Sequence, residues 1–206
     1  MALINAQTLR EFCEDEVFTF RIAAADTLVD RDSERFSKEC LEGLASLYVG
    51  RPVLSDHSWN VGKQLARVYA AEVEHQGEEA RLVLSCYTPR NEKSQNLIES
   101  IEAGVLREAS VGVAIQSAKC SICGTDKASG YCEHRPGRSY DGRTCVVTLS
   151  EPTDAYEISL VAVPAQPKAG VIKAYHGDSA VPKPNEEVLK LAEARLQMEE
   201  IRYGGN

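Results

Sequence analysis

Positive charge is in short supply in this sequence. Its 206 residues hold 23 Lys and Arg against 31 Asp and Glu, which gives a formal net charge of −8 at pH 7. Proteins that bind nucleic acid without sequence specificity do so by neutralising phosphates with lysine and arginine side chains. The acidic balance therefore argues against a nucleic-acid-binding function.

Long apolar runs are also missing. No stretch approaches the ~18 consecutive apolar residues that a membrane-spanning helix needs, so no membrane association is expected. The first residues, MALINA, lack the basic and then apolar regions of a secretory signal. The chain has no internal repeat and no long low-complexity segment. With 43% hydrophobic and 26% charged residues, the composition is that of a globular protein, and the length suits one domain with a tail.

Hydrophobic patterning predicts an α+β fold. The strands come largely as sequence neighbours joined by short turns, which favours a mostly antiparallel sheet or barrel with flanking helices. Prolines predict a linker over residues 171–184, between a domain of residues 1–170 and a C-terminal helix and tail over residues 185–206. Strands are expected over residues 17–25, 65–74, 81–87, 107–118, 145–149 and 156–163, and further helices over residues 37–48 and 91–102.

The seven cysteines are unevenly spread. Cys13, Cys40 and Cys86 are isolated in apolar or mixed stretches and are predicted to be buried free thiols, since free cysteine behaves as a small hydrophobic residue. The other four lie in an insertion over residues 119–145. In a chain without a secretion signal, such clustering suggests a metal site before disulfides.

This cysteine-rich insertion carries a candidate zinc site. Cys120 and Cys123 form a C-x2-C knuckle, and Cys132 and His134 follow after a short segment. Three thiolates and one imidazole complete the tetrahedral shell of a structural zinc and leave no open position for a catalytic water. The insertion is rich in Gly, Ser, Lys and Asp, so a metal would supply stability that it cannot obtain from a core. Cys145 is a competing fourth ligand in place of His134.

Three further residues form a candidate catalytic set. Ser110 lies on a predicted strand with small neighbours, which leave space above its hydroxyl. His57, in the stretch SDHSW, can act as a general base near neutral pH. Glu157 lies in an apolar strand, where a carboxylate is costly unless paired, and pairing with an imidazole would hold the ring. Asp154 is a second candidate for that role, whereas Asp56 is adjacent to the histidine and should point away from it. Each residue alone also fits an ordinary structural role.

Together these segments resemble the prohead (capsid maturation) proteases of tailed bacteriophages over roughly residues 17–170. The opening FRIAAADTLVDRDSERFS is similar to that family's first strand and acidic loop. GRPVLSDHSW resembles its histidine motif and LREASVGVAI its serine motif. DAYEISLVAVPAQPKAGV resembles its closing segment. The last two motifs, in this order and at this spacing, are the specific part of the resemblance.

The resemblance implies a serine endopeptidase with an assemblin-like fold, related to the herpesvirus assemblins and built on a β-barrel core flanked by helices. Ser110 then matches the nucleophile, His57 the general base and Glu157 the orienting acid. The implied substrates are the scaffold protein, the major capsid protein and the protease itself, inside the immature capsid in the host cytoplasm. A homodimer or a higher oligomer is compatible with it. The cysteine-rich insertion departs from the simplest members of the family.

Two other functions stay open on the sequence. The chain could be a non-enzymatic, zinc-bearing structural or interaction module of a phage particle, with the insertion as its working surface. It could also be a cysteine or metal hydrolase, in which case Cys86 is the only strand cysteine that comes into question as a nucleophile.

Overall fold

The computed structural model describes residues 1–175 and three single positions further on, residues 190, 194 and 197. The expected linker beyond residue 175 and the expected C-terminal helix therefore lie almost wholly outside the described residues. Within the described part, no helix is both long enough and apolar enough to cross a membrane.

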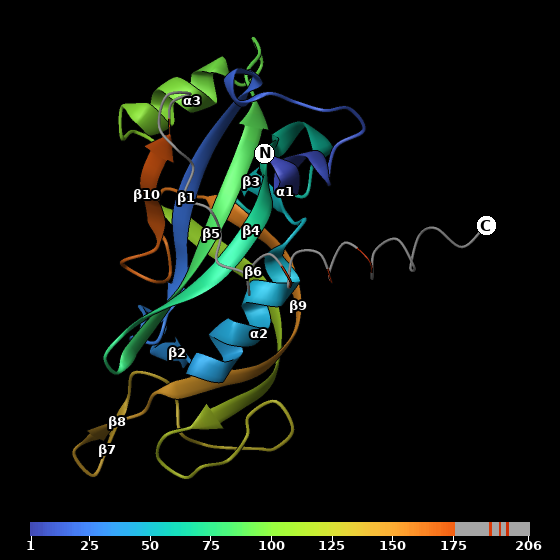
Figure 1. Ribbon diagram of the computed structural model, residues 1–206. Helices are drawn as coiled ribbons and strands as arrows, with labels where there is room; N and C mark the ends of the chain where they lie inside the picture. The colour runs from blue at the N-terminus through green and yellow to red at the C-terminus, as the bar shows by residue number, and fades with distance from the viewer. Residues whose placement is uncertain (176–189, 191–193, 195–196, 198–206) are drawn as a thin grey trace.

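One large mixed sheet dominates the molecule (Figure 1). The α+β class is confirmed, with many strands and few helices, but the sheet is not closed into a barrel. Its order is β10-β1-β5-β4-β3-β9-β2, and β6 pairs with β9 off this path. The elements are α1 (Ala2–Asn5), η1 (Glu14–Glu16), β1 (Val17–Asp26), β2 (Glu34–Phe36), α2 (Lys38–Tyr48), β3 (Pro52–Ser55), η2 (Val61–Lys63), β4 (Gln64–Gln76), β5 (Glu79–Pro89), α3 (Gln95–Glu102), β6 (Ala109–Cys120), β7 (Ser139–Tyr140), β8 (Arg143–Thr144), β9 (Val147–Leu160) and β10 (Gly170–Tyr175).

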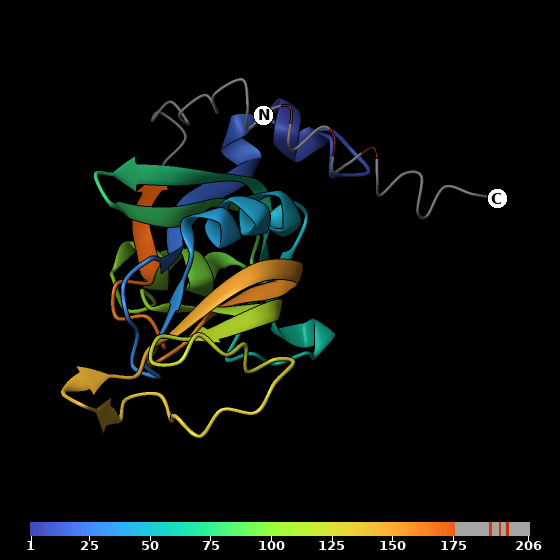
Figure 2. The same ribbon diagram turned by 90° about the horizontal axis from the view of Figure 1, so that it is seen from below.

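Helix α2 packs inside the curve of the sheet, between β9 and the β4–β5 hairpin (Figure 2). Ser37 caps its N-terminus by accepting a hydrogen bond from the Cys40 amide over 3.1 Å. Burying one side chain of leucine size contributes roughly 1.5–3 kcal/mol, so this face of the helix ties β9 to the hairpin. Five residues of the helix are buried: Cys40, Leu41, Leu44, Ala45 and Tyr48.

Two expectations about the C-terminal half of the sheet are wrong. Residues 147–160 form the single strand β9 rather than two strands. The sequence showed two separate strand patterns, over residues 145–149 and 156–163, but the residues between them also belong to the strand. Pro152 lies beside a register shift in the β6–β9 pairing, where a proline is tolerated. Residues 170–175 form β10, which pairs antiparallel with β1, where a linker was expected. The prolines before this segment end the preceding loop and do not exclude a strand after them.

The cysteine-rich insertion connects β6 to β9 at one end of the sheet, with the small β7–β8 hairpin inside it (Figure 1). Strands β6 and β9 pair antiparallel along almost their full length, from Ala109 opposite Leu160 to Cys120 opposite Val147. The insertion therefore occupies the position of the turn in a long β-hairpin. The serine and glutamate motifs lie at the opposite end of that hairpin.

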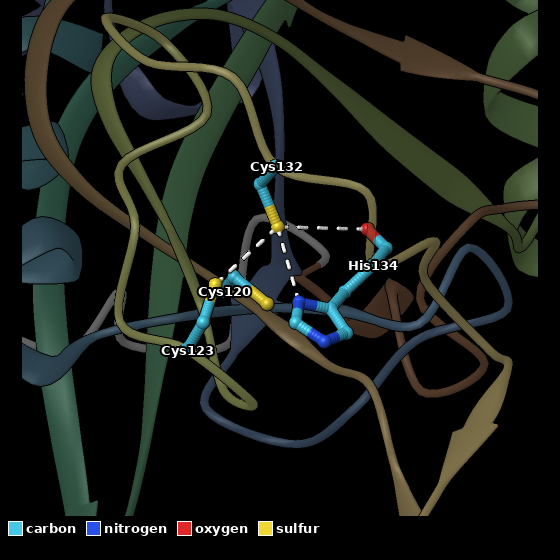
Figure 3. Close-up of side chains that lie close together, drawn as sticks. All are labelled: Cys120, Cys123, Cys132 and His134. Carbon is cyan, nitrogen blue, oxygen red and sulfur yellow. Dashed lines mark hydrogen bonds between the residues drawn. The ribbon is translucent and has the colours of Figure 1, made fainter.

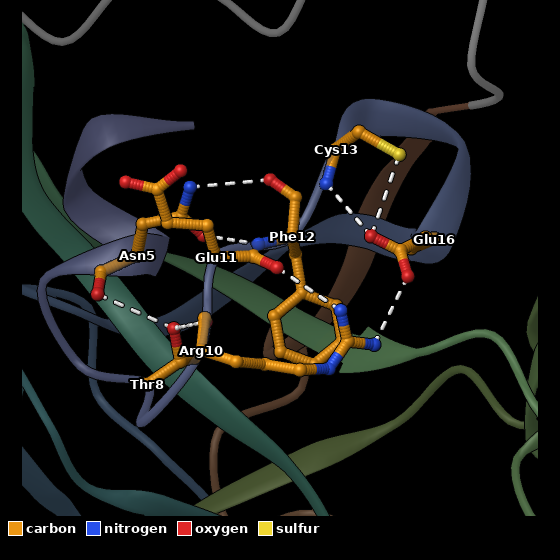
Figure 4. A network of polar contacts seen from close by, with 7 residues as sticks. All are labelled: Asn5, Thr8, Arg10, Glu11, Phe12, Cys13 and Glu16. Carbon is orange, nitrogen blue, oxygen red and sulfur yellow. Dashed lines mark hydrogen bonds and ion pairs between the residues drawn. The ribbon is translucent and has the colours of Figure 1, made fainter.

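A polar network fixes the N-terminal segment before β1 (Figure 4). The Arg10 guanidinium donates to Glu16 over 3.0 Å, and the Cys13 amide donates to the same carboxylate over 2.9 Å. These hydrogen bonds lower the pKa of Glu16 to about 2. Cys40 and Cys86 are buried as expected, but Cys13 is exposed, because its turn lies outside the core.

Candidate catalytic and metal sites

The pairing of β6 with β9 brings the serine and glutamate motifs onto one face. Ser110 lies directly opposite Ser159, and Gly112 lies directly opposite Glu157. Residues two apart on a strand point to the same side of the sheet, and directly opposed residues share a side. These four residues therefore form a small polar patch on one face of the hairpin.

The Glu157 carboxylate is buried at the centre of this patch, with 2% of the residue exposed. Its Oε1 lies 2.8 Å from the Nδ1 atom of His57. Its Oε2 accepts a hydrogen bond from the Ser159 hydroxyl. Both oxygens thus have a partner, which a buried carboxylate requires. Because an ionised carboxylate can only accept, Nδ1 of His57 carries the proton, and Nε2 of the neutral ring is left free to take one.

His57 reaches the carboxylate through a strained turn. Strand β3 runs parallel to β9, and the next two residues, Asp56 and His57, both have left-handed backbones, with φ of 53° and 51°. Such conformations cost roughly 1–3 kcal/mol each and persist where the surroundings hold them. Here the His57 amide donates to the Ser159 hydroxyl over 2.9 Å, and the Asp56 amide donates to the Leu160 carbonyl over 3.1 Å. The ring itself is 43% exposed, so it is accessible to a bound molecule.

Two supporting residues are missing from the sequence-based candidate set. Ser159 joins the His57 backbone to the Glu157 carboxylate. Tyr48 is wholly buried, and its hydroxyl donates to the backbone carbonyl of Glu157 over 3.1 Å. Burial, and then the Glu157 charge, raise the pKa of Tyr48 well above its usual value, so it stays protonated as a donor. The Glu-x-Ser spacing was a usable signal for Ser159, because it places both side chains on one face.

Ser110 lies beside a cavity. It is half-buried and contributes to the wall of a cavity of about 450 Å³ that also touches β1, β2 and the loop before β10. Among the described residues, its hydroxyl has no hydrogen-bond partner and is not bonded to the His57 ring. The structure therefore places the serine on the face that holds the His57–Glu157 pair, without direct contact between serine and histidine.

Asp154, the alternative orienting acid, lies elsewhere. Its carboxylate accepts from the Arg51 guanidinium over 2.8 Å and from the Ala155 amide over 2.9 Å. Of the two acids weighed from the sequence, only Glu157 contacts His57.

The close approach of Glu157 to β6 requires glycine at position 112. A β-carbon added there would lie 2.2 Å from Glu157 Oε1, which is far inside contact distance. Gly112→Ala should therefore push the carboxylate away from His57 and destabilise the fold by about 1–3 kcal/mol. We expect the hydrogen-bonded Nδ1 proton signal of His57 to disappear from the NMR spectrum. Gly62→Ala is the matched control, since its β-carbon meets only the flexible Asn60 side chain. An unchanged proton signal in Gly112→Ala would contradict this packing.

The four predicted metal ligands gather at the other end of the β6–β9 hairpin (Figure 3). The ligand atoms of Cys120, Cys123, Cys132 and His134 all lie within 4.8 Å of one another. The Cys132 sulfur lies 3.4 Å from the Cys123 sulfur and 3.4 Å from Nδ1 of His134. With zinc–sulfur bonds of 2.3 Å, sulfurs at the corners of a tetrahedron are about 3.8 Å apart. The cluster therefore fits a metal ion such as zinc.

The chemistry of the cluster supports the same conclusion. Burial opposes ionisation of the Cys120 thiol, but backbone amides and neighbouring thiols outweigh it and lower the pKa of Cys120 to about 6. A metal-binding cysteine must be a thiolate, so this environment favours the binding form. Cys145 is fully buried, with its sulfur 3.7 Å from that of Cys120. His134 points into the cluster (Figure 3), and its ring nitrogen, not the Cys145 sulfur, completes the group of four ligand atoms that lie within 4.8 Å of one another.

Comparison of the chain with known proteins gives no matching family model and no similar curated protein.

Proposed function

We propose that the protein is a serine endopeptidase in which Ser110 is the nucleophile, His57 the general base and Glu157 the acid that orients the histidine. One observation carries the proposal: a buried carboxylate holds the imidazole at 2.8 Å on the strand face that also presents Ser110. A nucleophile, a base and an orienting acid are the three parts that acyl transfer needs. The motif resemblance to prohead proteases supports the same three roles.

The reaction follows from these roles. The Ser110 Oγ attacks the carbonyl carbon of the scissile peptide bond while Nε2 of His57 takes the hydroxyl proton. The imidazolium then gives that proton to the leaving amine, and an acyl ester remains on Ser110 until water hydrolyses it. Glu157 stabilises the imidazolium and holds the ring. Hydrogen bonds between catalytic groups often tighten only when substrate is bound, which is consistent with the absence of a Ser110–His57 bond here.

The proposed substrates are segments of the scaffold and major capsid proteins, and of the protease itself, within an immature phage capsid. The support is the resemblance of the histidine, serine and closing motifs to prohead proteases. Enclosure in a shell raises the local concentration of enzyme and substrate, so that a modest intrinsic rate suffices.

The proposed role of the metal is structural. Cys120, Cys123, Cys132 and His134 would hold a zinc ion with all four positions filled, and the ion would supply stability to the insertion. The three thiolates and the imidazole leave no position for a substrate or water. The insertion then serves to hold the end of the β6–β9 hairpin, far along the strands from Ser110.

Covalent labelling tests the nucleophile directly. A fluorophosphonate probe should add once to the protein, forming a bond from phosphorus to Ser110 Oγ with loss of fluoride, because only an activated serine reacts readily. Intact-mass and peptide mass spectrometry should place the adduct on Ser110. The Ser110→Ala variant should take no adduct. Ser117→Ala, which removes a buried serine from the same strand, should label as the wild type does; an adduct that survives in Ser110→Ala would refute the assignment.

A non-enzymatic zinc-bearing module is the second candidate function, and the Cys₃His cluster is the observation that favours it. It predicts no adduct on any variant, even with candidate capsid and scaffold segments present. A cysteine nucleophile at Cys86 is disfavoured, because this thiol is fully buried and burial raises its pKa far above the usual value.

A further inference from the structure

The edge of β6 opposite β9 is open beside Ser110. Within the described residues, β9 is the only strand that pairs with β6. The other edge is covered at its two ends, by a bridge between Glu108 and Gly170 and by a bridge between Lys119 and Asp126. Between these bridges, the strand presents backbone groups that no described strand uses. An open edge of this kind is a template for an added strand.

The alternation of backbone hydrogen bonds along β6 shows which amide and carbonyl groups face this edge. The Ala109 amide donates away from β9, to the Ala169 carbonyl over 3.2 Å, whereas the Glu108 carbonyl accepts from Val161 on the β9 side over 3.0 Å. Backbone groups alternate in direction along an antiparallel strand. The amide and carbonyl of Val111 therefore point to the open edge, directly after the Ser110 side chain. A peptide paired there would pass beside the serine hydroxyl.

The space for such a peptide is the cavity of about 450 Å³ beside Ser110. Strand β6 forms one wall, with Val111, Val113 and Ile115 among its apolar contributions, and Phe36 and Leu149 extend this apolar lining. An extended segment with apolar side chains at alternate positions fits such a wall, because successive side chains of a strand point to opposite faces.

Acidic residues also line this cavity. Asp30, Asp32 and Glu34 all line it, and none of them forms an ion pair with a lysine or arginine in the part of the chain that is described. The neighbouring arginines are used elsewhere, since Arg31 donates to the Pro164 carbonyl and Arg35 to the Thr148 hydroxyl. The negative charge therefore faces the cavity without a partner from this chain.

The missing positive charge affects the Glu34 carboxyl group. Partial burial, and then the charges of Asp30 and Asp32, raise its pKa above the usual value. A cationic side chain in the cavity would oppose this shift, because its charge favours the ionised form of the carboxyl group. Asp30 has a second task, because its Oδ1 accepts from the amides of Asp32 and Glu34 and shapes the loop. Asp32 and Glu34 are thus the acids that can be changed without removing that turn.

We infer that the protein binds its substrate as an added strand along the open edge of β6, and that Asp32 and Glu34, which line the same cavity, select a lysine or arginine side chain of the bound segment. This inference rests on the proposed function in one respect: the bound peptide is a substrate only if the protein is a protease. The binding of an extended, basic peptide does not depend on catalysis. The charge-assisted contacts of such a side chain are worth about tenfold or more in affinity against an uncharged analogue.

The test uses four pools of octapeptides with Lys, Arg, norleucine or Glu fixed at a central position and an equimolar mixture of Ala, Val, Leu and Ser elsewhere. Binding of fluorescein-labelled pools to Ser110→Ala is measured by anisotropy, and hydrolysis of quenched pools by the wild type gives kcat/KM. The Lys and Arg pools should bind about tenfold more tightly than the norleucine pool and be cleaved with the same preference. The Glu pool should bind worst.

Acid substitutions then locate the preference. Asp32→Asn with Glu34→Gln should bring the ratio of Lys-pool to norleucine-pool affinity close to one. Asp15→Asn with Glu92→Gln makes the same change in net charge at exposed positions outside the cavity and should retain the preference. N-methylation of the two amides that flank the fixed lysine should weaken binding, because one of them must face the strand edge.

The two proposals fail in different ways. Equal binding of the Lys and norleucine pools, no binding of any pool, or a preference that survives Asp32→Asn with Glu34→Gln would overturn the inference, whatever the catalytic result. Selective binding without hydrolysis and without a fluorophosphonate adduct would support the inference and overturn the proposed protease function.

Discussion

Replacing Glu157 by glutamine should lower kcat for peptide hydrolysis by roughly 10⁴-fold, as expected when the orienting acid of a Ser-His-acid triad becomes an amide. The buried Oε1 holds Nδ1 of His57 at 2.8 Å. An amide nitrogen at that position would donate to Nδ1, and the proton would move to Nε2, where the base must be free. Substrate KM should change little, since Glu157 is buried beneath the site.

Asp154→Asn is the matched control for this substitution. It makes the same chemical change three residues away, at a half-exposed carboxylate that pairs with Arg51, and partly exposed ion pairs contribute about 0–1 kcal/mol. Its kcat should stay within about twofold of the wild type. If Asp154→Asn lost activity and Glu157→Gln kept it, the orienting acid would have to be reassigned. Circular dichroism of both variants checks that the fold is retained.

Loss of one cysteine ligand should release the metal and make the insertion more mobile. Cys123→Ser is expected to weaken zinc binding by more than about 100-fold. Substitution of residues that only hydrogen-bond to a metal ligand already lowers metal affinity by about 10–100-fold. Native mass spectrometry should show one zinc on the wild type and none on the variant. Limited proteolysis should then cut between residues 121 and 144 before it cuts the sheet, because the insertion has little buried apolar surface of its own.

Two further substitutions decide the fourth ligand. His134→Ala should lose zinc as Cys123→Ser does, because Nδ1 of His134 lies in the cluster. Cys145→Ser should retain zinc, since that sulfur is not one of the four ligand atoms that lie within 4.8 Å of one another. Zinc retained in His134→Ala and lost in Cys145→Ser would reverse the assignment. Neither substitution should alter fluorophosphonate labelling of Ser110, at the far end of the hairpin.

Local signals were enough to predict the elements whose sequence cues agree with one another. The β4–β5 hairpin was expected from two strand patterns around residues 76–79, and Gly77 supplies the left-handed backbone of the turn, with φ of 62°. Helix α2 follows from its Ser37 cap and its apolar stripe. In both cases the pattern and its boundary residues lie within a short window.

The misses depend on contacts that are distant in sequence. Strand β10 has only six residues, and its partner is β1, about 150 positions earlier, so no local pattern identifies it. Closure of the sheet was inferred from the resemblance, but it depends on whether β6 finds a second partner. Strand β9 was expected as two separate strands, because bulges cannot be read from the hydrophobic pattern.

In the candidate site, too, some features were predicted from local sequence and others depend on contacts that are distant in sequence. His57, Ser110 and Glu157 were proposed from their local motifs, and the structure brings the histidine and the glutamate together. The choice between Glu157 and Asp154 could not be made from sequence, because it depends on the bulges in β9. Tyr48 and the left-handed backbones of Asp56 and His57 carry no local signal.

The position of the insertion within the β6–β9 hairpin bears on how the chain folds. Before these strands pair, a loop of about 26 residues must be closed, at an entropic cost of roughly 3 kcal/mol. Zinc bound early to the four ligands would tie this loop at its base and let pairing spread from Cys120 and Val147 toward Ser110 and Ser159. The metal would then set the rate at which the segments that carry Ser110 and Glu157 pair. A chain made without zinc would assemble the candidate site slowly, but the folded protein would still be active.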